Sequence, residues 1–342
     1  FKFLFYFNFE NDIIFLLEFL SCSSINIEGG SIMNKRTYDK AIRMMQKGQY
    51  TLSELGIMPK DIIYIKNLEN NVKMHYDPRK EDYVYYLAPY DDMAYIVISE
   101  ASSEPETVKI LEMSDIHTGC KTFDEKSLRT YLEKAVKNGT QYVHIAGDLF
   151  DGNGVYRGHE KNLRYHLAKE QIDKLYSILC EYDLWYIATI GNHDESFCTH
   201  GGVDPVSVLE ERMARSARRF TYLNAFEGNI VHKGVVFRLI HLKGNMSKSK
   251  SYPPQRYLGN VLRSNFNNVI LGGKEYNIRS INAGHFHVQY SLNLAGIFSV
   301  MPGNFQYDAD YTKRMGITGN TGAAFVTVTI QNEKIIEYEL EM

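Results

Sequence analysis

Short apolar runs alternate with longer amphipathic segments between residues 108 and 219. A continuous apolar run is typical of a strand buried on both faces, and an amphipathic segment predicts a helix. Their alternation indicates βαβ units with right-handed crossovers. The expected strands are Val108–Ser114, Tyr142–Ala146 and Leu184–Ile190, and the expected helices are Asp124–Asn138, Lys161–Tyr182 and Pro205–Arg219. After Phe220 the pattern predicts hairpins at Ile230–His241, Tyr290–Val300 and Ala323–Glu341.

Five of the strand-like runs end on side chains that can bind metal ions. In chain order these side chains are Asp115 and His117, Asp148, Asn192 and His193, His241, and His285 and His287. Ligands of open α/β sheets bind beyond the carboxyl ends of the strands, so we expect these residues to share one edge. Their carboxylate, amide and imidazole groups form a mixed set that suits a pair of divalent cations.

The same residues lie in five motifs whose order resembles that of the calcineurin-like metallophosphoesterase superfamily. The motifs are Asp-x-His (115–117), Gly-Asp-Leu-Phe-Asp (147–151), Gly-Asn-His-Asp (191–194), a lone His241 and Gly-His-x-His (284–287). The resemblance covers roughly Val108 to Glu341. It implies an α/β fold, a two-sheet sandwich flanked by helices, with metal ions at the ends of the sheets.

The resemblance also implies a role for each side chain. Asp148 would bridge two divalent cations. The other ligands would be Asp115, His117 and His287 for the first metal position, and Asn192, His241 and His285 for the second. Manganese is the expected metal, and the ligand types also admit iron, zinc or nickel. Two such ions, about 3.5–4 Å apart, hold a phosphate and activate a water molecule for attack on phosphorus.

Residues next to these ligands have other expected roles. His193 would stabilise the transition state or protonate the leaving oxygen, with Asp194 orienting its imidazole. Asp151 is expected to shape the loop or to hold a ligand by a hydrogen bond. His232 competes with His241 for the isolated ligand position, but His232 precedes a hairpin turn whereas His241 ends an apolar strand, which favours His241.

Residues 34–89 follow a different pattern, with short helices and then a hairpin. The expected helices are Arg36–Lys47, Thr51–Leu55 and Met58–Asn70, and the expected hairpin strands are Val72–Tyr76 and Asp82–Leu87. This order resembles a winged helix-turn-helix, a module that often places its third helix in the DNA major groove. The candidate phosphate contacts are Lys60, Lys66, Arg79 and Lys80. The alternative is that the module serves only for protein docking or packing.

The predicted organisation has four parts. Residues 33–89 form the winged helix-turn-helix, 90–106 an interdomain linker and 107–342 the metallophosphoesterase domain. Residues 1–32 are interpreted as translated upstream sequence, because Glu28–Met33 can be encoded by a purine-rich ribosome-binding sequence followed by a start codon. This segment has neither the layout of a secretory signal nor the length of a membrane span.

Composition narrows the partners and the compartment. The formal net charge of -3 provides no global positive field, so any contact with nucleic acid must be local. The four cysteines, Cys22, Cys120, Cys180 and Cys198, show no paired spacing and predict free thiols in a reducing compartment. We therefore expect a cytoplasmic protein, of bacterial or phage origin by the resemblance, with no membrane partner; the pattern leaves the oligomeric state open.

The sequence after Asp151 favours one kind of phosphoesterase. Phosphoprotein phosphatases of the superfamily follow this Asp with Arg-Gly, whereas Gly152 and Asn153 follow it here. The motif instead resembles the nuclease subunit of double-strand-break repair complexes and, more closely, a phage and prokaryotic branch with a helix-turn-helix start. Two segments shared with that branch supply candidate substrate contacts at Tyr156, Arg157, His159 and Arg256.

Three functions follow from these patterns. The first is a metal-dependent phosphodiesterase or nuclease acting on DNA. The second is hydrolysis of a small phosphoester, with the N-terminal module used for assembly or regulation. The third is a non-catalytic DNA-bound scaffold, as in polymerase small subunits, against which the complete ligand set speaks.

Overall fold

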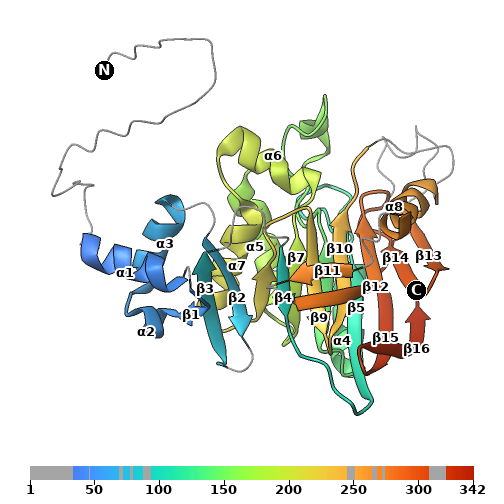
Figure 1. Cartoon of the computed structure of the whole chain (residues 1–342). Helices are drawn as coiled ribbons and strands as arrows, with labels where there is room; N and C mark the ends of the chain where they lie inside the picture. The colour runs from blue at the N-terminus through green and yellow to red at the C-terminus, as the bar shows by residue number, and fades with distance from the viewer. Residues whose placement is uncertain are drawn as a thin grey trace, which may run out of the picture.

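The computed structural model describes residues 34–45, 47–68, 72–77, 80–87, 94–244, 251–263, 268–271, 274–307 and 321–342. From residue 94 onward the chain forms two mixed sheets that pack face to face, with helices on the outside (Figure 1). This arrangement confirms the α/β sandwich that the motifs implied.

The first sheet contains the predicted βαβ units. Its strand order is β16-β15-β5-β6-β7-β8, with β5 (Glu106–Met113), β6 (Tyr142–Ala146), β7 (Trp185–Thr189), β8 (Phe220–Tyr222), β15 (Ala324–Gln331) and β16 (Lys334–Glu341). Strands β5 to β8 run parallel. The outer face packs against α4 (Glu125–Lys137), α5 (Ala168–Leu179) and α7 (Pro205–Arg215).

Helix α5 begins later than the amphipathic pattern predicts. The segment before it forms a short 3₁₀ helix, η1 (His159–Asn162), and then a loop. The backbone groups of this loop bond to the loop after β5 instead of to a helix: the Arg164 amide donates to the carbonyl of Gly119, and the Lys121 amide to that of Asn162. The prediction of a helix from Lys161 was therefore wrong over its first two turns.

The second sheet has the order β13-β14-β12-β10-β9-β4, with β11 paired to β12. Its strands are β4 (Tyr95–Val97), β9 (Glu227–His232), β10 (Val235–His241), β11 (Asn268–Leu271), β12 (Lys274–Gly284), β13 (Gln289–Leu294) and β14 (Ile297–Pro302). Strands β10, β12 and β14 run parallel to one another. Helix α8 (Tyr252–Arg263) adds to the apolar cluster on its outer face.

Strand β4 corrects the interpretation of residues 90–106 as a linker. Tyr95–Val97 pairs in parallel with β9, and Ile96 is buried between the two sheets. The polar composition near Ser102 concealed this short edge strand. Further elements that the pattern missed include β8, α8, β11 and helix α6 (Asn192–Gly201), which begins shortly after β7.

Residues 34–87 form a small unit with its own apolar core. Its elements are α1 (Lys35–Met45), β1 (Tyr50–Thr51), α2 (Leu52–Leu55), α3 (Pro59–Leu68), β2 (Val72–Asp77) and β3 (Asp82–Leu87). These elements confirm the predicted helices and hairpin, and Thr51 caps α2 through a reciprocal bond with Glu54. The assignment of this unit to the winged helix-turn-helix fold remains a prediction.

The N-terminal unit rests on α7 and β8, beside the helical layer (Figure 1). The hydroxyl of Tyr83 bonds to the backbone of Phe220 and lies 2.9 Å from the carbonyl of Arg218. Next to this contact, Pro59 and Ile62 of α3 face α7 across an apolar pocket of about 200 Å³. One side of α3 is therefore turned toward the second domain.

Two observations within the described part of the chain concern the cysteines and the helices. Cys120, Cys180 and Cys198 are free thiols; Cys22 lies outside the described residues. None of the helices described there has the length and apolar character needed to cross a membrane.

Candidate metal centre

All the predicted metal ligands meet at the edge where the parallel strands of both sheets end. Asp115 and His117 follow β5, Asp148 follows β6, and Asn192 begins α6 directly after β7. From the second sheet, His241 is the last residue of β10, and His285 and His287 follow β12. The expectation of one shared edge holds, because the carboxyl ends of parallel strands point the same way.

The backbone is strained at five of these residues. Asp115, His117, Asp148 and His287 have φ near +52°, and His285 has φ of +99°. A non-glycine residue in the left-handed region costs about 1–2 kcal/mol. Such strain is typical of sites where the surrounding structure forces side chains into a required position. Here it accompanies side chains at the strand ends that point toward one another.

Three glycines of the motifs lie where no side chain fits. A Cβ atom on Gly147 would lie 2.6 Å from Nδ1 of His241, and one on Gly191 would overlap the carboxylate of Asp148. A Cβ atom on Gly284 would overlap the carbonyl oxygen of Ala146. The main chains at the strand ends therefore pack directly against one another, which brings the candidate ligands of different strands close together.

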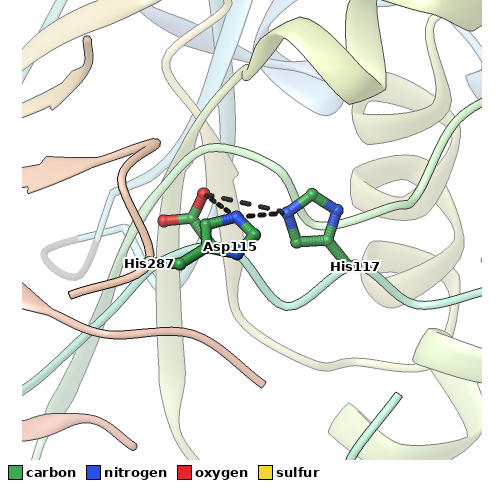
Figure 2. Close-up of side chains that lie close together, drawn as sticks. All are labelled: Asp115, His117 and His287. Atoms are coloured by element: carbon green, nitrogen blue, oxygen red, sulfur yellow. Dashed lines mark hydrogen bonds and ion pairs between the residues drawn. The ribbon is translucent and has the colours of Figure 1, made fainter. Parts of the chain in front are cut away.

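The first group of ligand atoms comes from Asp115, His117 and His287, whose side chains point toward one another (Figure 2). Nε2 of His117 lies 3.0 Å from Nε2 of His287. Oδ1 of Asp115 lies 3.3 Å from Nε2 of His287 and 3.8 Å from Nε2 of His117. Oδ2 of Asp148 lies 3.7 Å from Nε2 of His117, which joins this group to the second.

The second group comes from Asp148, His241 and His285, with Asn192 beside it. Nε2 of His241 lies 3.2 Å from Oδ2 of Asp148, 3.0 Å from Oδ1 of Asn192 and 3.3 Å from Nδ1 of His285. Asp148 therefore lies between the two groups, in the place expected of a bridging carboxylate.

These atoms fit a cation because they are mostly acceptors. Nδ1 of His241 lies 2.8 Å from the carbonyl oxygen of Ala146, which only accepts, so Nδ1 carries the hydrogen. In a neutral His241 the lone pair of Nε2 then faces the oxygen atoms of Asp148 and Asn192. His117 repeats this arrangement, because its Nδ1 lies 3.0 Å from the carboxylate of Asp151. Converging lone pairs require a proton or a metal ion between them.

The pKa shifts of the candidate ligands indicate which of them carry a proton when no metal is bound. Burial alone would raise the pKa of Asp148, but the imidazoles of His241 and His193 hold it well below its usual range. Burial would lower the pKa of His241, yet the carboxylate of Asp148 raises it to about 9. Burial would also raise the pKa of Asp115. The imidazoles of His287 and His117 outweigh this effect and hold that pKa well below its usual range.

Asp151 holds the residues around the candidate ligands. Its Oδ1 accepts from Nδ1 of His117 at 3.0 Å, and its Oδ2 accepts from Nε2 of His159 at 3.1 Å. Its backbone carbonyl accepts from Nδ1 of His193 at 2.7 Å. This agrees with the expected supporting role, and Asp151 holds three imidazoles, two through its carboxylate and one through its backbone carbonyl.

The expected contact between Asp194 and the His193 imidazole is wrong. The buried Asp194 carboxylate accepts from the backbone amides of Phe150 at 2.8 Å and Gly191 at 2.9 Å. It therefore ties the loop after β6 to the loop after β7. The error arose because Asp194 lies in the first turn of α6, where its side chain turns back to the helix N-terminus.

The structure separates the candidate substrate contacts. His159 is fully buried, and both its ring nitrogens are engaged, one with Asp151 and the other with the Val155 amide. It therefore cannot contact substrate. Tyr156 is half-buried with its ring 4.5 Å from that of His159, and Arg157 is exposed on the same loop.

Arg256 is exposed on α8, on the side of the second sheet. Its guanidinium lies 5.9 Å from the centre of the Tyr252 ring. Within the described residues no ion pair joins it to the candidate ligands. Its role toward substrate stays a prediction.

Of the four candidate DNA contacts, the structure describes the side chains of Lys60 and Lys80. Lys60 is exposed at the start of α3, and Lys66 lies within α3. Lys80 forms a 2.7 Å ion pair with Glu54 of the neighbouring helix, so its charge is already neutralised. Arg79 lies outside the described residues.

Gln306 is a site residue that the sequence analysis missed. Its Nε2 lies 3.2 Å from Oδ1 of Asp151 and 3.2 Å from Sγ of Cys120. The signal was present: the apolar strand β14 ends at Pro302, and Gly303 and Asn304 follow it, which repeats the apolar-run-then-glycine pattern of the other strand ends.

Comparison with protein families gives one match over the second domain. The model of the family described as calcineurin-like phosphoesterase matches residues 108–289. This range begins within β5 and ends after the last of the candidate ligands.

Curated relatives share part of this region. The DNA polymerase II small subunit of Methanocaldococcus jannaschii is 27% identical over 249 residues, which are 62% of this chain and 41% of that protein. The protein of the same name from Thermoplasma acidophilum is 32% identical over 110 residues, 30% of this chain and 22% of that protein. The chain thus spans less than half the length of these relatives.

Solved structures with a similar fold include a novel archaeal phosphodiesterase, with 16% identity and a TM-score of 0.38. That match covers 68% of this chain and 99% of the other. Zinc-complexed Vps29 from Entamoeba histolytica has 12% identity and a TM-score of 0.35, over 68% of this chain and 98% of the other.

The packing at Gly152 leads to a testable prediction. Gly152 and Gly154 have similar left-handed backbones, with φ of +74° and +73°. A Cβ atom on Gly152 would overlap the His193 carbonyl and Ser196 Oγ, whereas one on Gly154 meets nothing closer than His200 at 3.5 Å. We expect Gly154→Ala to cost about 1 kcal/mol of unfolding free energy and Gly152→Ala at least about 2 kcal/mol more, measured by urea unfolding. Equal losses would contradict the described packing.

Proposed function

This chain belongs to the calcineurin-like phosphoesterase family, and on that basis we propose that it is a metal-dependent phosphodiesterase whose substrate is DNA. The family is one of phosphoester hydrolases. The coarse activity follows from membership, and the substrate and the residue roles are our proposal.

One observation carries the proposal. Carboxylate, amide and imidazole acceptors, buried or half-buried, converge from both sheets into two groups that share Asp148. Assembling these groups without a cation costs free energy twice, through backbone strain and through facing lone pairs. A centre for two divalent cations explains both costs.

Each ligand then has a defined position. Asp115, His117 and His287 would hold one ion, and Asn192, His241 and His285 the other, with Asp148 between them. The ligand types suit Mn²⁺, which we propose as the metal, and also Fe²⁺, Zn²⁺ or Ni²⁺. Two such ions would neutralise the phosphoryl charge and lower the pKa of a water molecule toward about 7.

His193 is the proposed catalytic residue that does not bind metal. Its Nδ1 donates to the Asp151 carbonyl, which leaves Nε2 available. Burial lowers the pKa of His193 to about 4 in the absence of ligands. An anionic phosphoryl group beside Nε2 would raise this pKa again, so that the imidazole acquires a proton as substrate binds. It can then stabilise the transition state or protonate the leaving oxygen.

DNA is the proposed substrate for two reasons. The sequence after Asp151 lacks the Arg-Gly of phosphoprotein phosphatases, and the N-terminal unit has the element order of a winged helix-turn-helix. The exposed Tyr252–Arg256 pair on α8 and Arg157 are candidate contacts to the nucleic acid.

The names of the curated relatives favour a second candidate function. They are DNA polymerase II small subunits, so this chain would serve as a subunit of a DNA-bound assembly. The position of the N-terminal unit supports such a role, because α3 is turned partly toward α7 and Lys80 is paired with Glu54. In that case the unit serves for packing or docking rather than for reading DNA.

The test of function is a Mn²⁺-supplemented assay on single-stranded DNA, double-stranded DNA and bis-p-nitrophenyl phosphate. Asp148→Ala and a chelated sample are the controls. Hydrolysis of DNA and of the small diester is expected. Cleavage of the small diester alone would show that the substrate is a small phosphoester rather than DNA. Cleavage of neither substrate would favour the role of a non-catalytic subunit.

His193→Ala tests the division of roles within the centre. The main-chain amide of residue 193, which donates to Asp148 at 2.9 Å, is retained in this variant. We expect turnover to fall about 10²–10⁴-fold, since only the general acid–base group is lost, while the bound metal stays at wild-type content by elemental analysis. His200→Ala, at an exposed position of the same helix, is the matched control. Loss of metal from His193→Ala would show that His193 is a ligand.

The raised pKa of His241 predicts coupling between metal and protons. Below about pH 9 the metal-free His241 is protonated, whereas an imidazole ligand must be neutral. Affinity for Mn²⁺ should therefore rise with pH up to that value, by about tenfold per pH unit for each displaced proton. Calorimetric titration in buffers of different ionisation enthalpy should detect the release of at least one proton. An affinity that does not change between pH 7 and pH 9 would be inconsistent with this arrangement.

A further inference from the structure

A chain of polar side chains runs between the two sheets behind the candidate metal centre. It consists of Glu112 on β5, His144 on β6, His232 on β9 and Asn282 on β12. All four are at most 1% exposed. Burying polar groups among apolar side chains costs free energy unless they are hydrogen-bonded. None of the four belongs to the proposed ligand set.

The hydrogen bonds link two strands of each sheet. Nδ2 of Asn282 donates to Oε2 of Glu112 at 2.7 Å. The other carboxylate oxygen, Oε1, lies 3.3 Å from Nδ1 of His144. Nε2 of His144 in turn lies 3.2 Å from Nε2 of His232. The order of strands along the chain of bonds is thus β12, β5, β6 and β9.

Three of these strands end in the candidate centre. Glu112 precedes Asp115 by three residues, Asn282 precedes His285 by three, and His144 precedes Asp148 by four. At about 3.3 Å per residue, the polar chain lies roughly 10–13 Å along the strands from the ligands. Asn282 also bonds to main chain, with its Nδ2 3.2 Å from the Met113 carbonyl.

We propose that Glu112 and Asn282 are positioning residues of the metal centre, which lock β12 against β5 and β6 so that the ligands of the two sheets meet. The inference rests on the proposed metal centre. Apolar contacts between stacked sheets have no preferred direction, so they resist sliding weakly. A buried hydrogen bond has a fixed geometry and loses its partner when one strand moves, so it defines the register.

One assignment of the imidazole hydrogens is consistent with every hydrogen bond of the polar chain, and it sets the order from donor to acceptor. The oxygens of Glu112 accept from the Asn282 amide on one side and from Nδ1 of His144 on the other. Burial and the adjacent His144 hold the pKa of His232 well below its usual range, so His232 is neutral. Its Nε2 then donates to Nε2 of His144. Nδ1 of His232 is left as an acceptor with no partner within the described part of the chain.

Glu112→Gln reverses the order of donors and acceptors along the polar chain and leaves the side-chain volume almost unchanged. The amide of Gln would accept from Asn282 and donate to Nδ1 of His144. The hydrogens of both imidazoles must then move, and His232 is left with an unpaired buried donor. Asn282→Leu removes the link between the sheets altogether. Thr221→Val is the control, because it deletes a buried 3.0 Å bond to Trp185 between β7 and β8 of the first sheet, outside this polar chain.

The test measures Mn²⁺ affinity by calorimetry and the absorption spectrum of the Co²⁺-substituted protein. We expect Glu112→Gln and Asn282→Leu to weaken at least one Mn²⁺ site about 10–100-fold and to alter the Co²⁺ bands. Thr221→Val should leave both unchanged. Wild-type affinity and spectra in a folded Glu112→Gln protein, or an equal loss in Thr221→Val, would overturn the inference.

Measurements on the metal-free protein separate this inference from the proposed function. Amide exchange at residues 113–116 and 283–287 should be faster in both variants, and ¹⁵N spectra should show the reversed tautomer of His144 in Glu112→Gln. Wild-type protein that binds no divalent metal would overturn the centre and this role together. Two tightly bound ions in wild type and in both variants would overturn the positioning role alone.

Discussion

The architecture depends on holding imidazole nitrogens and carboxylate oxygens closer together than they would stay without positive charge between them. The main chain at Asp115, Asp148 and His285 enters the left-handed region to achieve this, and the carboxylate of Asp148 retains a proton on His241 in place of a metal. Asp115, His117, Asp148 and His241 are buried, so little water reaches these atoms to relieve the crowding. The free energy lost here must come from the apolar cores on both faces of the sheets.

Two supporting layers keep the crowded atoms in place. Nearest to them, Asp151 fixes the rings of His117 and His193, and Asp194 ties the loop after β6 to the loop after β7. Farther back, the polar chain through Glu112 and Asn282 joins the strands themselves. Both layers consist of directional bonds within an otherwise apolar interior. Rigid support of this kind is what a centre needs when a displacement of 1 Å costs function.

Much of the fold could be predicted because periodicity reports burial, and strands such as β6, β7 and β10 are apolar runs that are buried almost throughout. The ligand positions could be predicted from motif order, since parallel strands bring their ends together. Short elements could not be predicted. Strand β4 has only three residues, which is too few for a pattern. The 3₁₀ helix η1 and the loop after it replace the start of a predicted helix because their backbone groups bond near Gly119. The directions of the side chains of Asp194 and His159 could not be predicted either, because spacing along the sequence does not reveal which way a buried group turns.

The crowded glycines bear on how relatives of this protein should be judged. Gly147, Gly191 and Gly284 are needed because neighbouring main chain leaves no room for a Cβ atom, and that need persists whether or not the centre still performs chemistry. A pseudoenzyme descended from such a scaffold would therefore retain the glycines while its histidines and aspartates drift. The glycines of the five motifs record architecture, and only the metal-binding and ionisable side chains are diagnostic of a working hydrolase.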